Sequence, residues 1–396
     1  MSEPIISVLI PVYNSSEFLK ESIATVLNQT FKDIELVVVD DGSTDNSLEI
    51  LEDFAKSDNR IKIFTKENGG SASARNMALK NALGKYISFF DPDDYISSNL
   101  LELAYNSMIN NDSEIVMFKA DAFYGDKNII DKSFFRLDRD FNLENYDNFT
   151  FNYKDIKHWV LNRDFAPWAK LYKKEFLDSY DDFVFDEGVS FEDVPFHIKA
   201  MLRAEKISFV NEFLYHWRSD NPKSVTKTPN FCYDIFRIMD IIYEFLNQEG
   251  IYEEFELEYK IFELAHGYAY ILKVNSDDYF NMAKERIEDM GLEFIKNMPS
   301  NSREKYEVLS SSDNLEEFKI NNSLIPYKQK IKSLNDELTK FKKDNSKIKS
   351  DLNKLKKENK KLKNELDKSQ KLNKEILSSS SWKITEPLRK IKNVKK

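Results

Sequence analysis

Short apolar runs that end in polar clusters alternate with amphipathic segments over the first part of the chain. Three such runs, Ile5–Asn14, Ile34–Asp45 and Ile61–Phe64, are bounded closely by turn residues and are therefore predicted to begin as buried strands. The segments between them repeat apolar residues every three to four positions, as helices do. Strands that alternate with helices predict a doubly wound α/β sheet, in which ligands bind beyond the carboxyl ends of the strands.

A fourth apolar run, Ile87–Phe90, ends abruptly in the carboxylates Asp91, Asp93 and Asp94. Carboxylates gathered at the end of a buried strand repel one another, and a hard cation that also holds a phosphate would offset this repulsion. Taken alone, the stretch fits either a Mg²⁺ or Mn²⁺ site or an acidic turn that caps the next helix.

The polar groups at the predicted strand ends should converge on one crevice. They are Tyr13, Asn14, Asp40, Asp41, Arg75 and the acidic cluster Asp91–Asp94. An aromatic ring can stack on a base, a carboxylate can accept a ring N–H, and a metal can offset the charge of a diphosphate. The chain has no G-x-G-x-x-G after its first strand and no G-x-x-x-x-G-K-[ST], so dinucleotide oxidoreductases and P-loop NTPases lose support.

Four motifs in this order resemble the N-terminal half of family 2 glycosyltransferases, which have the GT-A fold: SVLIPVYN, VVVDDGSTD, NGGSASARNMAL and FFDPDD. The resemblance implies that residues 1–100 bind a nucleotide-diphosphate sugar, with UDP as the expected nucleotide. Pro11 and Tyr13 would flank the base, and Asp41 would bond its ring nitrogen with Asp40 beside it. Arg75 would reach the diphosphate or the donor sugar.

The resemblance also assigns the acidic cluster to a metal. Asp91 and Asp93 would form an Asp-x-Asp motif in which Asp93 holds Mn²⁺ or Mg²⁺ and Asp91 supports it. Asp94 is expected to shape the turn instead.

Residues 101–228 are predicted to form the acceptor-side half. There Glu192 and Asp193 precede an amphipathic helix, although acidic residues also simply suit a first helical turn. The resemblance implies that Asp193 is the general base that deprotonates an acceptor hydroxyl, with Glu192 as its neighbour or as an acceptor-site residue. It also implies that a single displacement inverts the sugar. Arg218 is a candidate for phosphate contact, whereas His216 either contacts the metal or diphosphate or is simply packed.

Composition limits the remaining possibilities. The single cysteine, Cys232, excludes an internal disulfide framework and suits the cytoplasm. No segment approaches the roughly 20 apolar residues needed to span a bilayer, and the N-terminus does not resemble a signal peptide. Charge is distributed unevenly along the chain. From Lys328 onward there are 23 Lys/Arg and 9 Asp/Glu, whereas the part before Lys328 has 35 Lys/Arg and 59 Asp/Glu. An acidic body argues against nucleic acid as the main ligand.

After a helical region at 229–322, residues 323–377 follow a heptad repeat. Position a reads Ile331, Leu338, Asn345, Leu352, Asn359, Leu366, Asn373, and position d reads Leu334, Phe341, Ile348, Leu355, Leu362, Ser369, Ile376. Acids occupy position g from Glu337 to Glu365, and lysine occupies four of the five following e positions. Asparagine at a favours two strands, so the pattern predicts a parallel homodimeric coiled coil.

The final segment, 378–396, mixes Trp382 and Leu388 with basic residues. It fits either a helix on an anionic membrane surface, peripheral on the inner face of the cell membrane, or a frayed basic end.

The sequence therefore predicts a metal-dependent inverting glycosyltransferase that extends a surface polysaccharide or a related glycan, with a glycan or lipid-linked acceptor. Two alternatives stay open: a catalytically inactive GT-A domain that acts as a dimeric scaffold, and a sugar nucleotidyltransferase. The donor sugar, the acceptor and the linkage are not encoded in any motif of the chain.

Overall fold

The computed structural model describes residues 3–125, 127–141, 143–162, 164–222, 230–288 and 290–380, and residue 384. It divides into two compact units, Met1–Lys319 and Ile320–Lys396, each of which is considered by itself. Among the described residues, no helix is both long enough and apolar enough to cross a membrane. Most of the final segment, including Trp382 and Leu388, lies outside the described residues.

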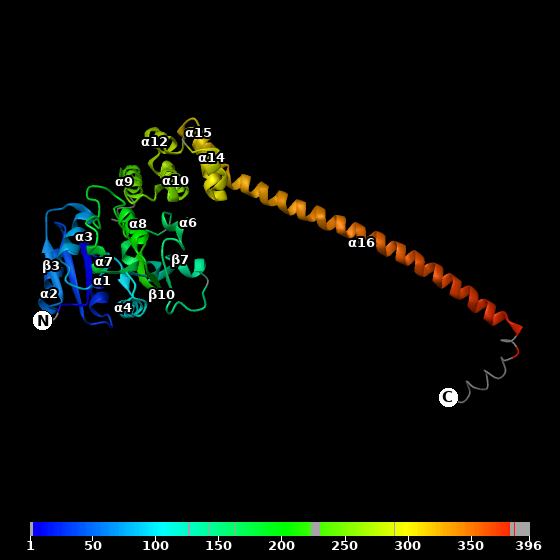
Figure 1. Cartoon of the computed structure of the whole chain (residues 1–396), viewed down its shortest axis with the longest axis horizontal. Helices are drawn as coiled ribbons and strands as arrows, with labels where there is room; N and C mark the ends of the chain where they lie inside the picture. Colours follow the sequence, from blue (N-terminus) through cyan, green and yellow to red (C-terminus); the bar gives the residue numbers. More distant parts are fainter. Residues whose placement is uncertain are drawn as a thin grey trace, which may run out of the picture. The chain divides into compact units, whose positions relative to one another are not determined.

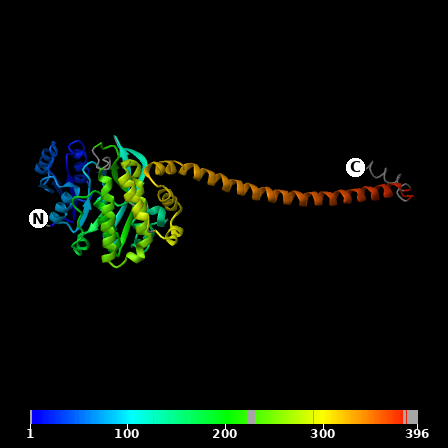
Figure 2. The same cartoon turned by 90° about the horizontal axis from the view of Figure 1, so that it is seen from above.

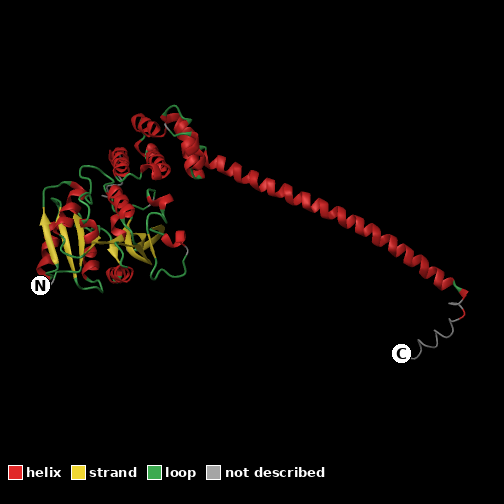
Figure 3. Ribbon diagram, viewed as in Figure 1, coloured by secondary structure: helices red, strands yellow, loops and turns green. Residues whose placement is uncertain are grey.

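Strands and helices alternate in the first part of unit 1, as the hydrophobic pattern predicts. The elements are β1 (Ile6–Val12), α1 (Leu19–Leu27), β2 (Ile34–Asp40), α2 (Ser47–Ser57), β3 (Ile61–Thr65), α3 (Gly70–Asn81), β4 (Tyr86–Phe89), β5 (Tyr95–Ile96) and α4 (Leu100–Asn111). Every residue of β1 and β2 is buried. Such continuous burial is typical of parallel strands whose two faces are both covered by helices, and Figure 3 shows the strands flanked by helices.

The acceptor-side half is less regular. Its elements are β6 (Ile115–Tyr124), β7 (Asn128–Phe134), α5 (Leu137–Phe141), β8 (Thr150–Phe151), α6 (Lys157–Val160), η1 (Pro167–Ala169), β9 (Lys170–Lys173), α7 (Lys174–Asp178), α8 (Asp193–Arg203) and β10 (Ile207–Arg218). The β6–β7 hairpin occupies part of the polar and aromatic stretch that follows the first half.

The described strands form one mixed sheet in the order β3-β2-β1-β4-β9-β6-β10-β5, with β7 and β8 paired outside this path. β1 pairs in parallel with β2 and β4, and β10 pairs in parallel with β6. β9 runs antiparallel between β4 and β6 and joins the two halves. The doubly wound mixed sheet predicted from the sequence is confirmed.

A helical subdomain completes unit 1 (Figure 1). It comprises η3 (Asn230–Tyr233), α9 (Asp234–Gln248), α10 (Tyr252–Ala269), α11 (Ile271–Val274), α12 (Asp277–Glu288), α13 (Leu292–Asn297), α14 (Ser300–Ser310) and the first part of α15 (Leu315–Ser323), within which unit 1 ends at Lys319. α10 packs against α9, α12 and α14, and α9 packs against α8 of the sheet-containing part.

Unit 2 is dominated by α16 (Ile325–Ser378), a single helix of 54 residues that Figure 2 shows without interruption. None of its residues is buried. Its apolar a and d side chains are between 41% exposed at Ile376 and 66% exposed at Phe341. This stripe has the heptad spacing predicted for a coiled-coil seam.

Candidate active site

The carboxyl ends of β1, β2 and β4 lie at one edge of the sheet because these strands are parallel and adjacent. Tyr13, Asp41 and Asp91 follow the three strand ends directly or after one residue. The residues expected to line one crevice therefore lie at this edge, where open α/β sheets bind ligands.

The Asp41 carboxylate holds the glycine-rich turn that begins α3. It accepts hydrogen bonds from the backbone N–H of Gly69 at 2.9 Å and of Gly70 at 2.8 Å, and it pairs with Lys66 Nζ at 2.8 Å. Gly42 follows Asp41 with a φ of +73°, and a Cβ there would lie 3.0 Å from the backbone N of Asn68. Asp41 thus fixes the turn. The predicted contact with a base would use the same carboxylate.

Asp40, at the end of β2, is 2% exposed. Its Oδ2 accepts the backbone N–H of Ser43 at 3.2 Å, whereas its Oδ1 is buried and has no hydrogen-bond partner among the described residues. A buried carboxylate oxygen without a donor is costly, and a donor supplied by a ligand would relieve that cost.

The two residues expected to flank a base differ in their surroundings. Tyr13 is 50% exposed just beyond β1, so its ring is accessible for stacking. Pro11 is buried within β1 opposite Val39. Asn14 adopts a φ of +48°, and its Oδ1 accepts the backbone N–H of Thr44 at 2.7 Å. Asn14 therefore ties the end of β1 to the turn after β2.

Arg75 of α3 connects the turn after β4 with the start of α8. Its Nη2 lies 3.0 Å from Asp91 Oδ1, and its Nη1 lies 2.8 Å from Glu192 Oε1. Burial opposes the guanidinium charge, but the negative charges of Asp91 and Glu192 outweigh it and raise the pKa of Arg75. The guanidinium of Arg75 thus links Asp91 to Glu192, the first residue of the predicted catalytic pair.

Glu192 and Asp193 lie at the start of α8, as predicted. Glu192 also accepts a hydrogen bond from Ser71 Oγ of α3. Burial and the neighbouring charge of Glu192 raise the pKa of Asp193 to about 6, against the opposing charge of Arg75. A carboxyl group with a pKa near the working pH suits general base chemistry, because it is ionised at neutrality yet accepts a proton readily.

The carboxylates of the acidic cluster after β4 have different surroundings. Asp94 is buried, and its carboxylate accepts hydrogen bonds from Tyr215 Oη at 2.6 Å and from the backbone N–H of Arg218 at 2.7 Å. It therefore supports the turn. Burial, and then the charge of Asp91, raises the pKa of Asp93. The raised pKa means that a nearby cation would stabilise the ionised form of Asp93.

Whether these residues fit a metal ion depends on the expected number of protein ligands. The described residues contain no group of three or more His, Cys, Asp or Glu side chains that could hold a metal. Mg²⁺ in phosphate-binding sites usually takes one or two carboxylates and completes its shell with substrate phosphates and water. Asp93 and Asp91 fit that mode, in which the donor diphosphate supplies the remaining ligands.

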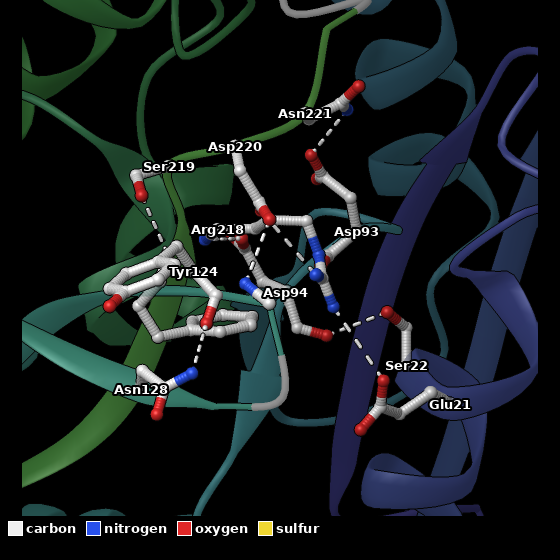
Figure 4. A network of polar contacts seen from close by, with 12 residues as sticks. Glu21, Ser22, Asp93, Asp94, Tyr124, Asn128, Arg218, Ser219, Asp220 and Asn221 are labelled. Atoms are coloured by element: carbon white, nitrogen blue, oxygen red, sulfur yellow. Dashed lines mark hydrogen bonds and ion pairs between the residues drawn. The ribbon is translucent and has the colours of Figure 1, made fainter.

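Arg218 has a different environment from that expected of a free phosphate contact. Its guanidinium lies between the rings of Phe18 and Phe123, 4.4 and 4.6 Å from their centroids. Its Nε donates to the backbone carbonyl of Asp93 at 2.8 Å (Figure 4). In the same network, Asn221 Nδ2 donates to Asp93 Oδ2 at 2.7 Å. Arg218 thus braces the turn that carries Asp93.

His216 is packed rather than directed at the acidic cluster. Its Nδ1 lies 2.7 Å from Asp121 Oδ1, its Nε2 lies 3.0 Å from Ser97 Oγ, and its ring stacks on Tyr95 at 4.3 Å. Both ring nitrogens therefore have protein partners.

Sequence reasoning missed Ser71, Tyr215 and Asn221, which contact Glu192, Asp94 and Asp93 respectively. Ser71 belongs to the quoted NGGSASARNMAL motif, so its position near the site had a signal. Tyr215 and Asn221 lie more than 120 residues beyond their partners, and no local pattern marks them.

Comparison with known proteins places this arrangement in a family. A model described as glycosyl transferase family 2 matches residues 7–180. Glycosyltransferase GlyG from Streptococcus pneumoniae is 35% identical over 221 residues, which span 55% of this chain and 71% of that protein. The chain belongs to glycosyltransferase family 2.

Other relatives in the family differ in coverage. The uncharacterized glycosyltransferase EpsJ from Bacillus subtilis is 36% identical over 57% of this chain, and the match spans 64% of that protein. The cholesterol galactosyltransferase from Borreliella burgdorferi is 30% identical over 77% of this chain and 87% of that protein. A crystal structure of S. aureus TarS in complex with UDP-GlcNAc aligns with a TM-score of 0.61 and 24% identity, over 82% of this chain and 92% of the solved chain. This likeness confirms the GT-A fold.

Proposed function

We propose that this protein is a metal-dependent inverting glycosyltransferase that moves a sugar from a nucleotide-diphosphate donor to a hydroxyl of a glycan or lipid-linked acceptor. The observation that carries the proposal is the double ion pair of Arg75 with Asp91 and Glu192. It joins Asp91, which is expected to support the metal, to Glu192, the neighbour of the expected general base Asp193.

On the donor side, the exposed ring of Tyr13 stacks on the base, with Pro11 supporting it from within β1. Asp41 accepts a base N–H in addition to holding Gly69 and Gly70, and the unpaired Oδ1 of Asp40 lies at the same strand end. Arg75 and Arg218 contribute positive charge near the diphosphate.

Asp93 and Asp91 hold Mn²⁺ or Mg²⁺ together with the diphosphate. When bound, the ion stabilises the negative charge that develops on the leaving group. Arg218 and Asn221 keep the Asp93 turn in place.

Asp193 takes the proton from the acceptor hydroxyl, whose oxygen then attacks the anomeric carbon opposite the leaving diphosphate. A single displacement inverts the configuration at that carbon. Arg75 pairs with Glu192 at 2.8 Å, and Asp193 is the carboxyl group of the pair whose pKa is raised to about 6, which suits it to accept a proton.

Two other functions are less well supported. A catalytically inactive scaffold would not need a carboxyl group whose pKa is raised to about 6 beside a buried arginine. A sugar nucleotidyltransferase would need a glycine-rich, basic N-terminal loop for a triphosphate, and the chain does not have this motif after β1.

The deciding experiment is a screen for donor turnover. Purified full-length protein is incubated with a panel of nucleotide sugars, with Mn²⁺ and with EDTA, and release of the nucleotide is measured. UDP-sugars are the first donors to test, since the structurally similar TarS was crystallised with UDP-GlcNAc. We expect turnover of at least one donor that EDTA abolishes. Absence of metal-dependent turnover or binding for every donor would refute the proposal.

We further propose that two copies associate through α16. Its exposed a and d stripe is unpartnered in the single chain, and acids at g face lysines at e in a parallel pair. The proposed site of action is the cytoplasm or the inner face of the cell membrane.

A further inference from the structure

The backbone directly before the catalytic pair is in an unusual conformation. Phe191 has a φ of +62°, in the left-handed region that bulky side chains rarely occupy. Its carbonyl accepts the backbone N–H of Val194 at 3.0 Å, which begins α8. The conformation of Phe191 therefore sets the direction in which Glu192 and Asp193 leave the loop. A strained residue at a functional site persists only where the surroundings hold it.

The surroundings that hold Phe191 come from the helical subdomain. Its ring packs against Phe231 of η3 at 4.9 Å and against Tyr270, which follows α10, at 5.6 Å. One residue earlier, the backbone N–H of Ser190 donates to Asp234 Oδ2 at the start of α9, at 2.8 Å. Three separate parts of the subdomain thus contact the two residues before Glu192.

One of these elements also reaches the environment of Asp193. Burial raises the pKa of Tyr270 to about 12, and the negative charge of Asp193 contributes to that shift. The Tyr270 ring thus packs on Phe191, two residues before Asp193, and lies within the range of the Asp193 charge.

We infer that Phe231, Tyr270 and Asp234 are positioning residues: they hold Phe191 in its left-handed conformation and thereby aim the Asp193 carboxylate and limit its contact with water. The inference rests on the proposed role of Asp193 as general base. It gives the helical subdomain a part in catalysis that its sequence does not indicate.

Several charged or titratable groups act on Asp193 besides Tyr270. They are Glu192 on the same helix, Arg75 from α3, Asp91 after β4, and Lys170 and Tyr172 from β9. None of these is changed by substitutions in the clamp formed by Phe231, Tyr270 and Asp234. A shift in the pH profile of a clamp variant would therefore report altered hydration or placement of Asp193.

The test compares a truncating and a conservative substitution at each of two positions. Tyr270→Leu removes the aromatic ring, whereas Tyr270→Phe keeps it. Asp234→Ala removes the acceptor for Ser190 N–H, whereas Asp234→Asn retains a side-chain oxygen that can accept it. Full-length proteins are assayed with saturating Mn²⁺ for hydrolysis of the UDP-sugar that the wild type hydrolyses best, so that water replaces the unidentified acceptor.

We expect the truncating variants to lose kcat by about tenfold or more, a part of the 10²–10⁴-fold that a positioned general base contributes. The acidic limb of their profile of kcat against pH should move to lower pH by about one unit. The reason is that a more hydrated carboxyl group has a pKa closer to its ordinary value. UDP affinity, measured by calorimetry, should not change. The conservative member of each pair should restore most of the kcat and the position of the limb.

Two results would overturn the inference. One is unchanged kcat and pH profile in folded Tyr270→Leu and Asp234→Ala. The other is a loss of rate with an unmoved acidic limb and weakened UDP binding, which would indicate a structural role only. If the wild type hydrolyses no donor, the proposed function fails separately, and the titration of Asp193 is then followed by carboxyl ¹³C NMR with Asp193→Asn for assignment. An unchanged Asp193 titration in Tyr270→Leu would then refute the clamp.

Discussion

At the scale of single residues, the two central carboxylates differ in what stabilises their charge. Asp93 receives a hydrogen bond from Asn221, and burial and Asp91 raise its pKa, so a cation is the partner that would favour its ionised form. Asp193 lies beside Glu192 and Arg75, which act on it in opposite directions. The two carboxyl groups are thus suited to different tasks, metal binding and proton transfer.

Asp93→Asn should lower metal-dependent turnover by about a hundredfold or more, because bound metal ions contribute several kcal/mol of charge stabilisation in such reactions. The measurement is nucleotide release, paired with calorimetric titration of Mn²⁺ in the presence of UDP. Asp33→Asn, at an exposed position before β2, provides the control. A variant that binds Mn²⁺ and turns over as the wild type does would contradict the assignment.

The proton-transfer role predicts a pH dependence with a definite sign. Because the pKa of Asp193 is raised to about 6, the base is ionised above that pH, and the rate should fall as the pH drops through about 6. Asp193→Asn should reduce kcat by about 10²–10⁴-fold and remove this limb. The profile of kcat against pH is measured alongside Asp181→Asn, which changes an exposed loop aspartate. An acidic limb that survives in Asp193→Asn would identify another base.

Residue identity could be predicted better than residue environment. The motifs pointed to Arg75, Glu192 and Asp193, and the structure brings these three together. Arg218 was also selected, yet no local pattern indicates that its guanidinium would be enclosed by Phe18 and Phe123. Such contacts join segments that lie far apart in the chain, so they cannot be predicted from local patterns in a single sequence.

At the scale of elements, the best predicted features are those determined locally. Strand ends marked by apolar runs and acidic residues were located to within a few residues, because buried parallel strands must be apolar throughout. The antiparallel insertion of β9 between β4 and β6 had no such signal. Its partners are set by tertiary pairing, which short-range patterns do not encode.

The turn that Asp41 holds is expected to be sensitive to loss of its charge. In Asp41→Asn an amide N–H₂ group would face the donors of Gly69, Gly70 and Lys66, so the free energy of unfolding should fall by about 1–3 kcal/mol. Urea denaturation measures this change, and calorimetry should show weaker UDP binding in the same variant. Asp53→Asn, which disrupts an exposed ion pair with Lys56, should have a smaller effect on stability. Equal stability losses in the two variants would argue against the role of Asp41 in the turn.

At the scale of the whole molecule, the dimer is predicted from a heptad repeat that lies within one segment of the chain. α16 keeps the predicted repeat on one continuous helix, and its apolar a and d side chains are exposed in the single chain. An amphipathic helix of this length buries its seam only by meeting another helix.

Asn359→Cys should form a disulfide-linked dimer under mild oxidation, because position a of one helix faces position a of its partner in a parallel pair. Asn364→Cys, at the outward f position of the same heptad, is the matched control and should cross-link far less. The native Cys232 is buried and should not contribute. Non-reducing electrophoresis provides the measurement, and equal cross-linking of the two variants would count against the in-register parallel arrangement.

The bridge that Arg75 makes between Asp91 and Glu192 has a consequence for the order of substrate binding. A cation and diphosphate that take over Asp91 leave more of the guanidinium charge to Glu192 and Asp193, and that charge favours the ionised base. Thermodynamic linkage is reciprocal, so the ionised base favours the same ligands by an equal free energy. Asp91 and the Glu192–Asp193 pair would therefore be coupled through one side chain: donor binding would lower the pKa of Asp193, and the base would be most fully ionised when the donor is already bound.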